Sequence, residues 1–277
     1  MQPPSPQPLA GVRILSLALN LPGPAALMRC RRMGAECIKI EPPAGDPMRR
    51  YEPTAYDALH EGVFVITTDL KDPVGQAVLH AEIARATVLL TSFRPSALAR
   101  LGLAWPDLTA RYPRLSQVAI VGGAGASAEA PGHDLTYQAE HGLVTGTELP
   151  TTLHADMAGA LMAAEAVLQA ALLRERGRYL EVPLAEAAAF LALPRHWGLT
   201  LPDGAVGGAN PGYRVYACRD GRIAVAALEP HFARALAAAV GLGQLAVEPL
   251  AAYFAARTRA ELDALARQHD LPLHTMA

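Results

Sequence analysis

Segments with the patterns of strands and of helices alternate along most of the chain, and this alternation limits the possible folds more than any other feature. An apolar run at 12–17 predicts a buried strand, and a helix over 22–33 precedes a second strand at 37–40. Pro24 suits the first turn of that helix, and Gly34 suits the residue after its end. Strands that alternate with helices predict a mostly parallel sheet covered on both faces, which is an α/β fold.

The same alternation continues beyond this opening. Further strands are predicted at 64–67, 87–90, 117–121 and 179–182, and further helices at 73–86, at 156–176 and from 184 onward. A Gly/Pro-rich stretch then indicates a linker, and Asp220-Gly221 between two strand-like runs predicts a hairpin. Helices are expected at 230–240 and 259–268. The predicted organisation is a large domain at 1–200, a linker at 201–211 and a smaller α+β domain at 212–277.

Charge and cysteine content exclude several classes of function. The 24 Lys and Arg residues nearly balance 26 Asp and Glu residues, so we expect neither a nucleic acid nor a membrane partner. Three cysteines, at spacings unlike those of a zinc site or a disulfide framework, fit a reducing compartment, and no metal site is predicted. Because the segment 1–8 is polar and no apolar run approaches the ~20 residues of a membrane helix, a cytoplasmic location is expected.

Two glycine-containing segments test the idea of a dinucleotide site. The segment 20–24 lies at the first strand-to-helix turn but lacks the glycine spacing that lets a backbone approach a pyrophosphate. The segment 122–125 follows a predicted strand but leads into 127–131, which is expected to be a loop. A nicotinamide or flavin site is therefore not predicted, and the second segment is interpreted as a mobile loop over a site.

Three titratable residues are candidates for catalysis, and each has a structural alternative. Asp156 begins the predicted long helix, where the helix dipole would hold its carboxylate ionised, although a simple N-cap explains the same position. His133 follows the glycine-rich loop, and a lone histidine can equally be structural. Glu229 lies between a strand and a helix, where capping of the first turn is the alternative explanation.

Many short motifs follow one another in a consistent order along the first half of the chain. They are Leu21-Pro22-Gly23-Pro24, Gly34-Ala35, Ile38-Lys39-Ile40-Glu41-Pro42-Pro43-Ala44-Gly45-Asp46, Thr68-Asp69-Leu70-Lys71, Ser92-Phe93-Arg94-Pro95, Leu101-Gly102-Leu103 and Tyr112-Pro113-Arg114-Leu115. Together they resemble the class III CoA-transferase family, also called the carnitine dehydratase family. The resemblance runs from about Leu9 to Leu271 and implies that family's fold, a large Rossmann-like domain with a smaller α+β domain.

Within that family the segments 132–137 and 227–232 resemble motifs of the α-methylacyl-CoA racemases. This resemblance implies that His133 and Asp156 form the acid/base pair of a 1,1-proton transfer and that Glu229 supports the histidine. Backbone amides at the start of the Asp156 helix would then hold the enolate. The transferase branch of the family implies instead that Asp156 is a nucleophile, which carries acyl groups and CoA in turn.

A third interpretation is an inactive relative that binds CoA or a partner. The family's usual Lys and Arg are replaced by 62–67, and the sequence ends near Pro272 where typical members continue, so a truncated small domain is expected. No permanently bound cofactor is predicted, because coenzyme A would enter as part of an acyl-CoA substrate. The cationic side chains proposed to contact it are Arg49, Arg50, Lys71 and Arg94.

The resemblance also implies an oligomeric state. Members of this family form interlocked homodimers, so a homodimer is the expected assembly. In such a dimer Asp156 of one chain and Glu229 of the other are expected to meet at the domain boundary, which makes the site a property of the dimer.

Overall fold

Residues 6–277 fold into two compact units in the computed structural model, and the chain passes from one to the other between Ala192 and Leu193. The first five residues, which begin the polar N-terminal segment, lie outside the described residues. The boundary falls inside helix α9 (Leu184–His196), whereas the linker was predicted at 201–211. Each unit is described below by itself.

The first unit is built on six parallel strands in the order β3-β2-β1-β4-β5-β6, which confirms the predicted α/β class. Every predicted strand of this unit is present within one or two residues of its expected ends. The strands are β1 Arg13–Ser16, β2 Glu36–Glu41, β3 Phe64–Thr67, β4 Val88–Thr91, β5 Ser116–Val121 and β6 Tyr179–Pro183. The strand order reverses between β1 and β4, and crevices for ligands form at such a switch point.

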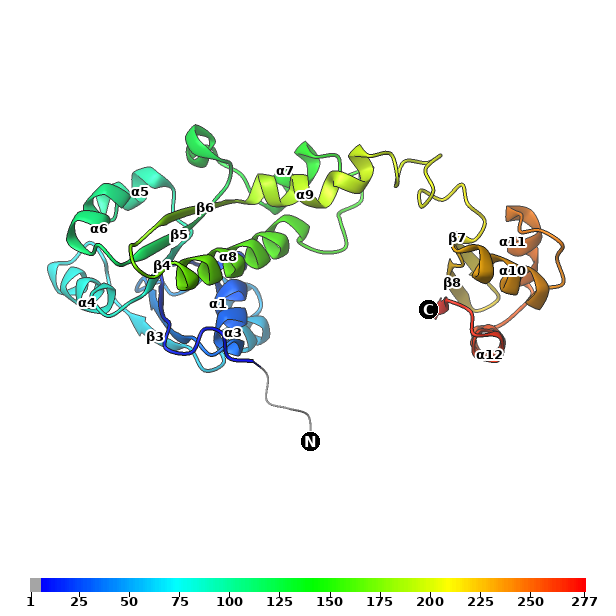
Figure 1. Cartoon of the computed structure of the whole chain (residues 1–277), viewed down its shortest axis with the longest axis horizontal. Coiled ribbons are helices and arrows are strands. Elements are labelled where there is room, and N and C mark those ends of the chain that lie inside the picture. The colour runs from blue at the N-terminus through cyan, green and yellow to red at the C-terminus, as the bar shows by residue number, and fades with distance from the viewer. Residues whose placement is uncertain (1–5) are drawn as a thin grey trace. The chain divides into compact units, whose positions relative to one another are not determined.

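Helices cover both faces of this sheet, as Figure 1 shows, with α4, α5 and α6 on one side and α1, α3 and α8 on the other. The helix α1 begins at Pro22 and ends at Arg32, before Gly34, whose φ of +97° favours glycine. The remaining helices of the unit are α2 Met48–Tyr51, α3 Pro53–His60, α4 Pro73–Ile83, α5 Pro95–Arg100, α6 Trp105–Arg111, the 3₁₀ helix η1 Gly125–Glu129, α7 Asp134–Glu140 and α8 His154–Leu172.

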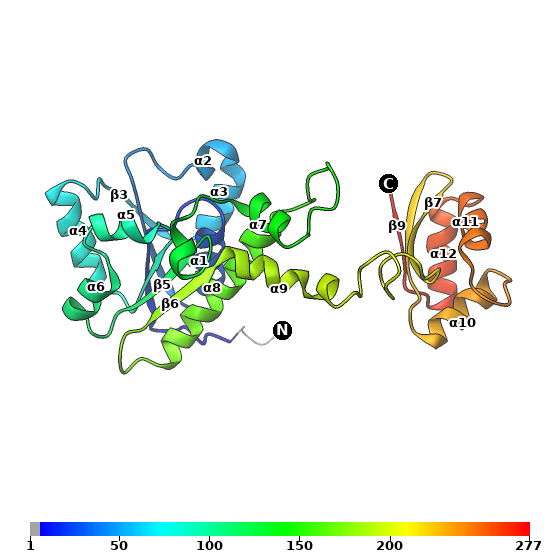
Figure 2. The same cartoon turned by 90° about the horizontal axis from the view of Figure 1, so that it is seen from above.

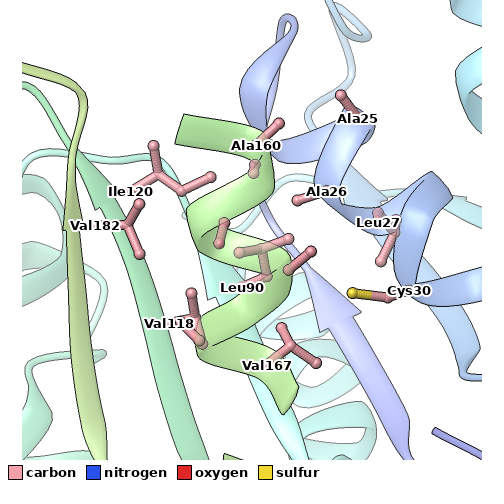
Figure 3. Close-up of a cluster of buried hydrophobic side chains, with 14 of the residues drawn as sticks. Ala25, Ala26, Leu27, Cys30, Leu90, Val118, Ile120, Ala160, Val167 and Val182 are labelled. Carbon is pink, nitrogen blue, oxygen red and sulfur yellow. The ribbon is translucent and has the colours of Figure 1, made fainter. Parts of the chain in front are cut away.

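Successive residues of the central strands point to opposite faces and so supply two separate cores. On β4, Val88 and Leu90 join the core under α1 and α8, whereas Leu89 joins the core under α4, α5 and α6. In Figure 3, Ala160 and Val167 of α8 lie among side chains of α1 and of the strands. The alanines of α8 leave room for α1 to pack closely, and their burial fixes the start of α8 against the sheet.

Helix α8 is the one helix among residues 6–277 that is long and apolar enough to cross a membrane by length and composition. Half of that apolar window is buried inside the unit, where α8 packs on α1 and on β5. A core helix of this composition passes the same test, so the apolar character of α8 is explained by its packing.

The second unit is a three-stranded antiparallel sheet with three helices beside it (Figure 2). Its strands are β7 Tyr213–Cys218, β8 Gly221–Ala226 and β9 Leu273–Met276, and its helices are α10 Pro230–Ala239, α11 Val247–Ala255 and α12 Arg259–His269. The predicted hairpin is β7 and β8, which turn at Asp220. The sequence interpretation missed the helix α11 and the strand β9. The strand β9 pairs with the side of β8 that β7 leaves free.

Candidate functional site

A cavity of about 290 Å³ opens where β1, β4 and β5 end, at the switch point of the parallel sheet. Leu19 and Asn20 follow β1, Phe93 and Arg94 follow β4, and Gly122 follows β5, and all five residues line it. Because the carboxyl ends of parallel strands meet at one edge, loops that are distant in sequence converge here.

Side-chain oxygens hold the loop after β1 in place. The backbone N–H of Leu19 donates to Ser92 Oγ at 3.2 Å, and the N–H of Asn20 donates to Asp46 Oδ1 at 3.0 Å. Asn20 has a φ of 64°, in the left-handed region that asparagine tolerates better than most residues. The rim of the cavity is therefore fixed by polar contacts from β4 and from the segment after β2.

The far wall of the cavity comes from Gly132, His133 and Tyr137, at the start of α7. A Cβ atom on Gly132 would lie 2.6 Å from the Tyr137 hydroxyl oxygen, so the phenol can approach the backbone only because this residue is glycine. The N–H of His133 donates to Thr136 Oγ1 at 3.0 Å, and the residue is exposed and lines the cavity. The backbone of His133 is thus held while its ring stays accessible.

Asp156 also lines this cavity, from the first turn of α8 as predicted. Burial, followed by the neighbouring carboxylate of Asp134, raises the pKa of Asp156 to about 6. The helix dipole was expected to favour the ionised carboxylate, but desolvation and a like charge act against it and make ionisation less easy than the dipole alone would. Burial and the charge of Asp156 also raise the pKa of Tyr137. Asp156 is ionised at neutral pH but binds a proton more readily than an ordinary aspartate.

Asp134 is a residue of the site that the sequence interpretation did not single out. Its side chain is buried at the start of α7, and Oδ1 accepts the backbone N–H of Asp156 at 3.0 Å. Gln138 donates to its other oxygen. Asp134 therefore caps a helix other than its own and places a second negative charge beside Asp156. Its position next to His133 was the one available signal.

The glycine-rich segment after β5, which was predicted to be a loop, contains the 3₁₀ helix η1. Glu129 accepts hydrogen bonds from the Ser96 N–H at 2.6 Å and from the Ser96 hydroxyl at 2.9 Å. The N–H of Gly125 donates to Glu181 Oε2 at 3.0 Å. Two carboxylates thus fasten this segment, one to α5 and one to β6.

A second cavity, of about 440 Å³, shares Leu19 and Phe93 with the first. Its remaining walls are largely apolar, and the charged residues Asp69, Lys71 and Arg100 also line it. A long ligand with an anionic end could therefore occupy both cavities around the shared Phe93.

The four cations predicted to contact a cofactor are not gathered in one place. Lys71 lines the second cavity and Arg94 lines the first. Arg49 donates to the Tyr56 hydroxyl at 2.7 Å and lies over its ring, and Arg50 is exposed and lines neither cavity. Arg100 is the cation that the sequence interpretation missed, and it lies in the same cavity as Lys71.

Glu229 belongs to the second unit, where it is exposed directly before α10. It occupies the N-cap position, but its side chain makes no capping hydrogen bond there. The structural alternative offered for this residue is thus not realised within the described chain. Its predicted support of the histidine stays a prediction.

Glu41, Asp46 and His60 form the one group in residues 6–277 whose ligand atoms lie close enough together, within 4.8 Å, to suggest a metal site. Lys39 Nζ already lies among them, 2.5 Å from Asp46, 2.8 Å from His60 Nε2 and 3.1 Å from Glu41. The lysine ammonium supplies the positive charge that a metal ion would bring. This cluster is accordingly an internal ion-pair network.

Comparisons with known proteins show which family the chain resembles in sequence and in fold. The family described as CoA-transferase family III matches residues 9–276. The cinnamoyl-CoA:phenyllactate CoA-transferase of Clostridium sporogenes is 36% identical over 151 residues, which are 50% of this chain and 37% of that protein. The α-methylacyl-CoA racemase of Homo sapiens is 30% identical over 255 residues, 84% of this chain and 65% of that protein. The crystal structure of the hypothetical protein Rv3272 from Mycobacterium tuberculosis superposes with a TM-score of 0.81 at 26% identity, covering 98% of this chain and 84% of that one.

Proposed function

We propose that this chain, which belongs to CoA-transferase family III, moves a proton at the carbon next to the carbonyl of an acyl-CoA thioester, as an α-methylacyl-CoA racemase does. The observation that carries the proposal is that His133 and Asp156 line one cavity, with the pKa of Asp156 raised to about 6. Inversion at carbon requires one group that removes the proton and another that returns a proton to the opposite face. Two titratable side chains in one small cavity meet that requirement.

The proton and electron balance is simple. In one direction the Asp156 carboxylate takes the α-proton and becomes a carboxylic acid, and the electron pair of the C–H bond moves into the thioester to give an enolate. The His133 imidazolium then returns a proton to the other face of the α-carbon. The reverse direction exchanges the two roles. Transfer is efficient when the catalytic pKa lies near the working pH, and the raised pKa of Asp156 brings it into that range.

The enolate oxygen needs a hydrogen-bond donor. The sequence predicted that backbone amides at the start of the Asp156 helix would supply it. The N–H of Asp156 at the start of α8 already donates to Asp134, so that amide is not free for an enolate. Tyr137 and Arg94 line the same cavity and carry donors. We assign the enolate contact to one of these two side chains, with Arg94 the stronger candidate because its donors are charged.

The nucleotide end of coenzyme A is placed in the second cavity under this proposal. Apolar walls suit an adenine ring, while Lys71 and Arg100 suit its phosphates. Phe93 belongs to both cavities, so the pantetheine arm would pass it to bring the thioester to Asp156. The proposed contacts to coenzyme A therefore include Arg100, which the sequence did not suggest, and no longer include Arg50.

A second candidate is CoA transfer between carboxylic acids, because Asp156 is the one carboxylate in the lining of the first cavity among the described residues. Its carboxylate would attack the acyl thioester, giving a mixed anhydride and releasing CoA thiolate. The thiolate would then attack the aspartyl carbonyl, which releases the carboxylic acid and leaves an aspartyl-CoA thioester. A second acid would accept the CoA by the reverse steps.

A homodimer remains part of the proposal. Large apolar side chains are exposed on α8 and α9, among them Leu161 and Phe190 at 51% and 67% exposure. A second copy of this chain is the partner that family membership favours for such a surface. Light scattering that finds only monomer at micromolar concentration would remove the dimer and, with it, the predicted meeting of Asp156 with Glu229 of a second copy.

Deuterium uptake from D₂O at the α-carbon of 2-methylacyl-CoA thioesters tests the proton transfer. We expect uptake with both enantiomers, and Asp156→Asn should lower it by about 10²- to 10⁴-fold for the enantiomer whose α-proton faces Asp156. No uptake across a panel of such thioesters contradicts it. Modification of Asp156 by hydroxylamine only after acyl-CoA is added would establish the transferase instead. Absence of CoA binding in calorimetry would indicate an inactive relative.

A further inference from the structure

A cavity of about 550 Å³ lies at the other edge of the first unit's sheet, where β4 and β5 begin. Thr87 and Leu115, which directly precede these strands, contribute to its wall. Four arginines line it: Arg85, Arg111, Arg114 and Arg174. No acidic side chain lines it in the part of the chain that the structure describes.

Helix ends explain part of this arrangement. The helices α4, α6 and α8 end beside the cavity, and arginines commonly stabilise such carboxyl ends. Arg174 does so directly, because its Nε donates to the carbonyl of Ala171 at 2.7 Å. Each helix end carries roughly half a negative charge, so three ends offset about one and a half of the four positive charges. A clear positive excess remains.

Neighbouring carboxylates do not remove that excess. Glu82 lies 3.6 Å from Arg85, but its other oxygen accepts from Arg13 at 2.6 Å. Within residues 6–277 no side-chain hydrogen bond or ion pair engages Arg111 or Arg114. Burial and, secondarily, the charge of Arg111 lower the pKa of the nearby His80, so the positive field extends beyond the cavity wall.

The positive edge continues past the cavity. The N–H of Gly177 donates to the carbonyl of Pro113 at 2.8 Å, which holds the segment with Arg176 and Arg178 beside the loop that carries Arg114. Both further arginines line a neighbouring cavity of about 470 Å³. Six of the chain's 24 Lys and Arg residues thus gather at one edge of a chain whose net charge is only −2.

We propose that this arginine-lined cavity binds a small molecule with two or more phosphate groups, at a site separate from the acyl-CoA cavities. Planar guanidinium groups match phosphate oxygens, and several of them converging on one concavity favour a multiply charged ligand over a single carboxylate. The concave shape favours a small ligand over an extended nucleic acid strand. This site does not depend on the reaction at Asp156.

Calorimetric titration of inorganic pyrophosphate into the full chain at low ionic strength tests the proposal. The paired variant Arg111→Gln/Arg114→Gln should weaken binding by about tenfold or more, since two charge-assisted contacts are lost. Arg267→Gln, which removes an exposed charge from α12, should leave it unchanged. The ring signals of His80, whose Nδ1 lies 3.1 Å from the Tyr112 hydroxyl at the cavity wall, should shift on binding.

The proposed coenzyme A site would also accept pyrophosphate. A second variant, measured in the same titration, distinguishes binding there from binding at the arginine-lined cavity. Lys71→Gln/Arg100→Gln should weaken CoA binding but leave the pyrophosphate response of His80 intact. Loss of pyrophosphate binding in this variant and not in the Arg111/Arg114 variant would overturn the proposal, as would no binding at all. Tighter binding of a single-stranded oligonucleotide, lost with the same arginines, would overturn the small-molecule assignment. Thermal melting of each variant checks that it is folded.

Discussion

Two pairs of neighbouring acidic residues are connected to the first cavity, and their charges are neutralised in one pair but not in the other. Glu41 and Asp46 are buried with the Lys39 ammonium between them, and Asp46 fixes the backbone of Asn20 on the cavity rim. Asp134 and Asp156 are also neighbours, yet no ion pair neutralises either one among the described residues.

The difference separates scaffold from chemistry. Where a cation offsets the carboxylates, the charges are closed off from solvent and serve to position a loop. Where it does not, burial and repulsion raise the pKa of one carboxyl to about 6, and that carboxyl is the one that reaches the cavity. A pair of buried carboxylates is therefore structural where a lysine neutralises it, as at Glu41 and Asp46. It is reactive where no cation does so, as at Asp134 and Asp156.

Replacing that lysine should have the largest effect on stability. Lys39→Met would leave two buried carboxylates without their nearest cation, which typically costs about 3–5 kcal/mol of unfolding free energy. Lys71→Met is the matched control, because Lys71 is exposed, and we expect it to cost less than about 0.5 kcal/mol. Urea denaturation at neutral pH measures both. A cost below about 1 kcal/mol for Lys39→Met would show that the network is not a scaffold.

Replacing Asp156 should raise the unfolding free energy, whereas replacing Lys39 should lower it. The pKa of Asp156 is raised from 3.8 to about 6 in the folded chain, so the fold prefers the protonated form and loses stability as the pH rises from about 4 to about 6. Asp156→Asn should therefore raise the unfolding free energy by about 2–3 kcal/mol at pH 8. This gain should shrink as the pH falls through 6 and vanish below about pH 4.

Asp107 provides the contrast for that experiment, because it is exposed in the first turn of α6. Asp107→Asn should be neutral or slightly destabilising at pH 8, since the helix dipole favours its charge. Urea denaturation at pH 8 and pH 4 measures both variants. If Asp156→Asn lowered the unfolding free energy at pH 8, the claim that the ionised Asp156 carboxylate destabilises the fold would be wrong.

Removing the neighbouring charge should move the pH dependence of activity. Asp134→Asn keeps an oxygen for the Asp156 N–H but loses the negative charge, so the pKa of Asp156 should fall. The acid limb of α-proton exchange should shift to lower pH, by less than half of the full shift because burial is the larger cause. Glu140→Gln, an exposed change on the same helix, is the control. An unmoved limb for Asp134→Asn would mean that the two carboxyls are not coupled.

The smallest expected effect concerns the segment over the cavity. Glu129→Ala removes both hydrogen bonds to Ser96, and residues 122–132 should then lose amide protection while the β strands keep theirs. Hydrogen–deuterium exchange measured by mass spectrometry reports on this segment directly. Unchanged protection would show that the contact of Gly125 with Glu181 holds the segment by itself.

Features that depend on local pattern could be predicted from the sequence. The apolar runs of the strands, Pro24 within α1 and Gly34 after it, and the placement of Asp156 in the first turn of a long helix all follow from such patterns. Features that depend on contacts distant in sequence could not. Asp134 caps a helix that begins 20 residues later, and nothing near it in the sequence indicates this.

Two features of the structure were not predicted, and the physical reason is the same for both. The helix dipole at Asp156 is a local effect and was recognised, but the burial and the Asp134 charge that outweigh it arise only when α7 and α8 pack. The neighbouring residues of β2 do not explain why a lysine, Lys39, is buried in this strand. Two of its partners, Asp46 and His60, come from later segments of the chain. Short elements such as β9 were missed since four residues carry little periodicity.

The most direct test of the account compares deuterium uptake from D₂O with each enantiomer of one 2-methylacyl-CoA, using His133→Ala and Asp156→Asn. If the two side chains serve opposite faces, each variant retains exchange with one enantiomer only, the two variants retain different enantiomers, and neither interconverts them. Loss of exchange with both enantiomers in Asp156→Asn, together with full racemisation by His133→Ala, would contradict the two-base arrangement.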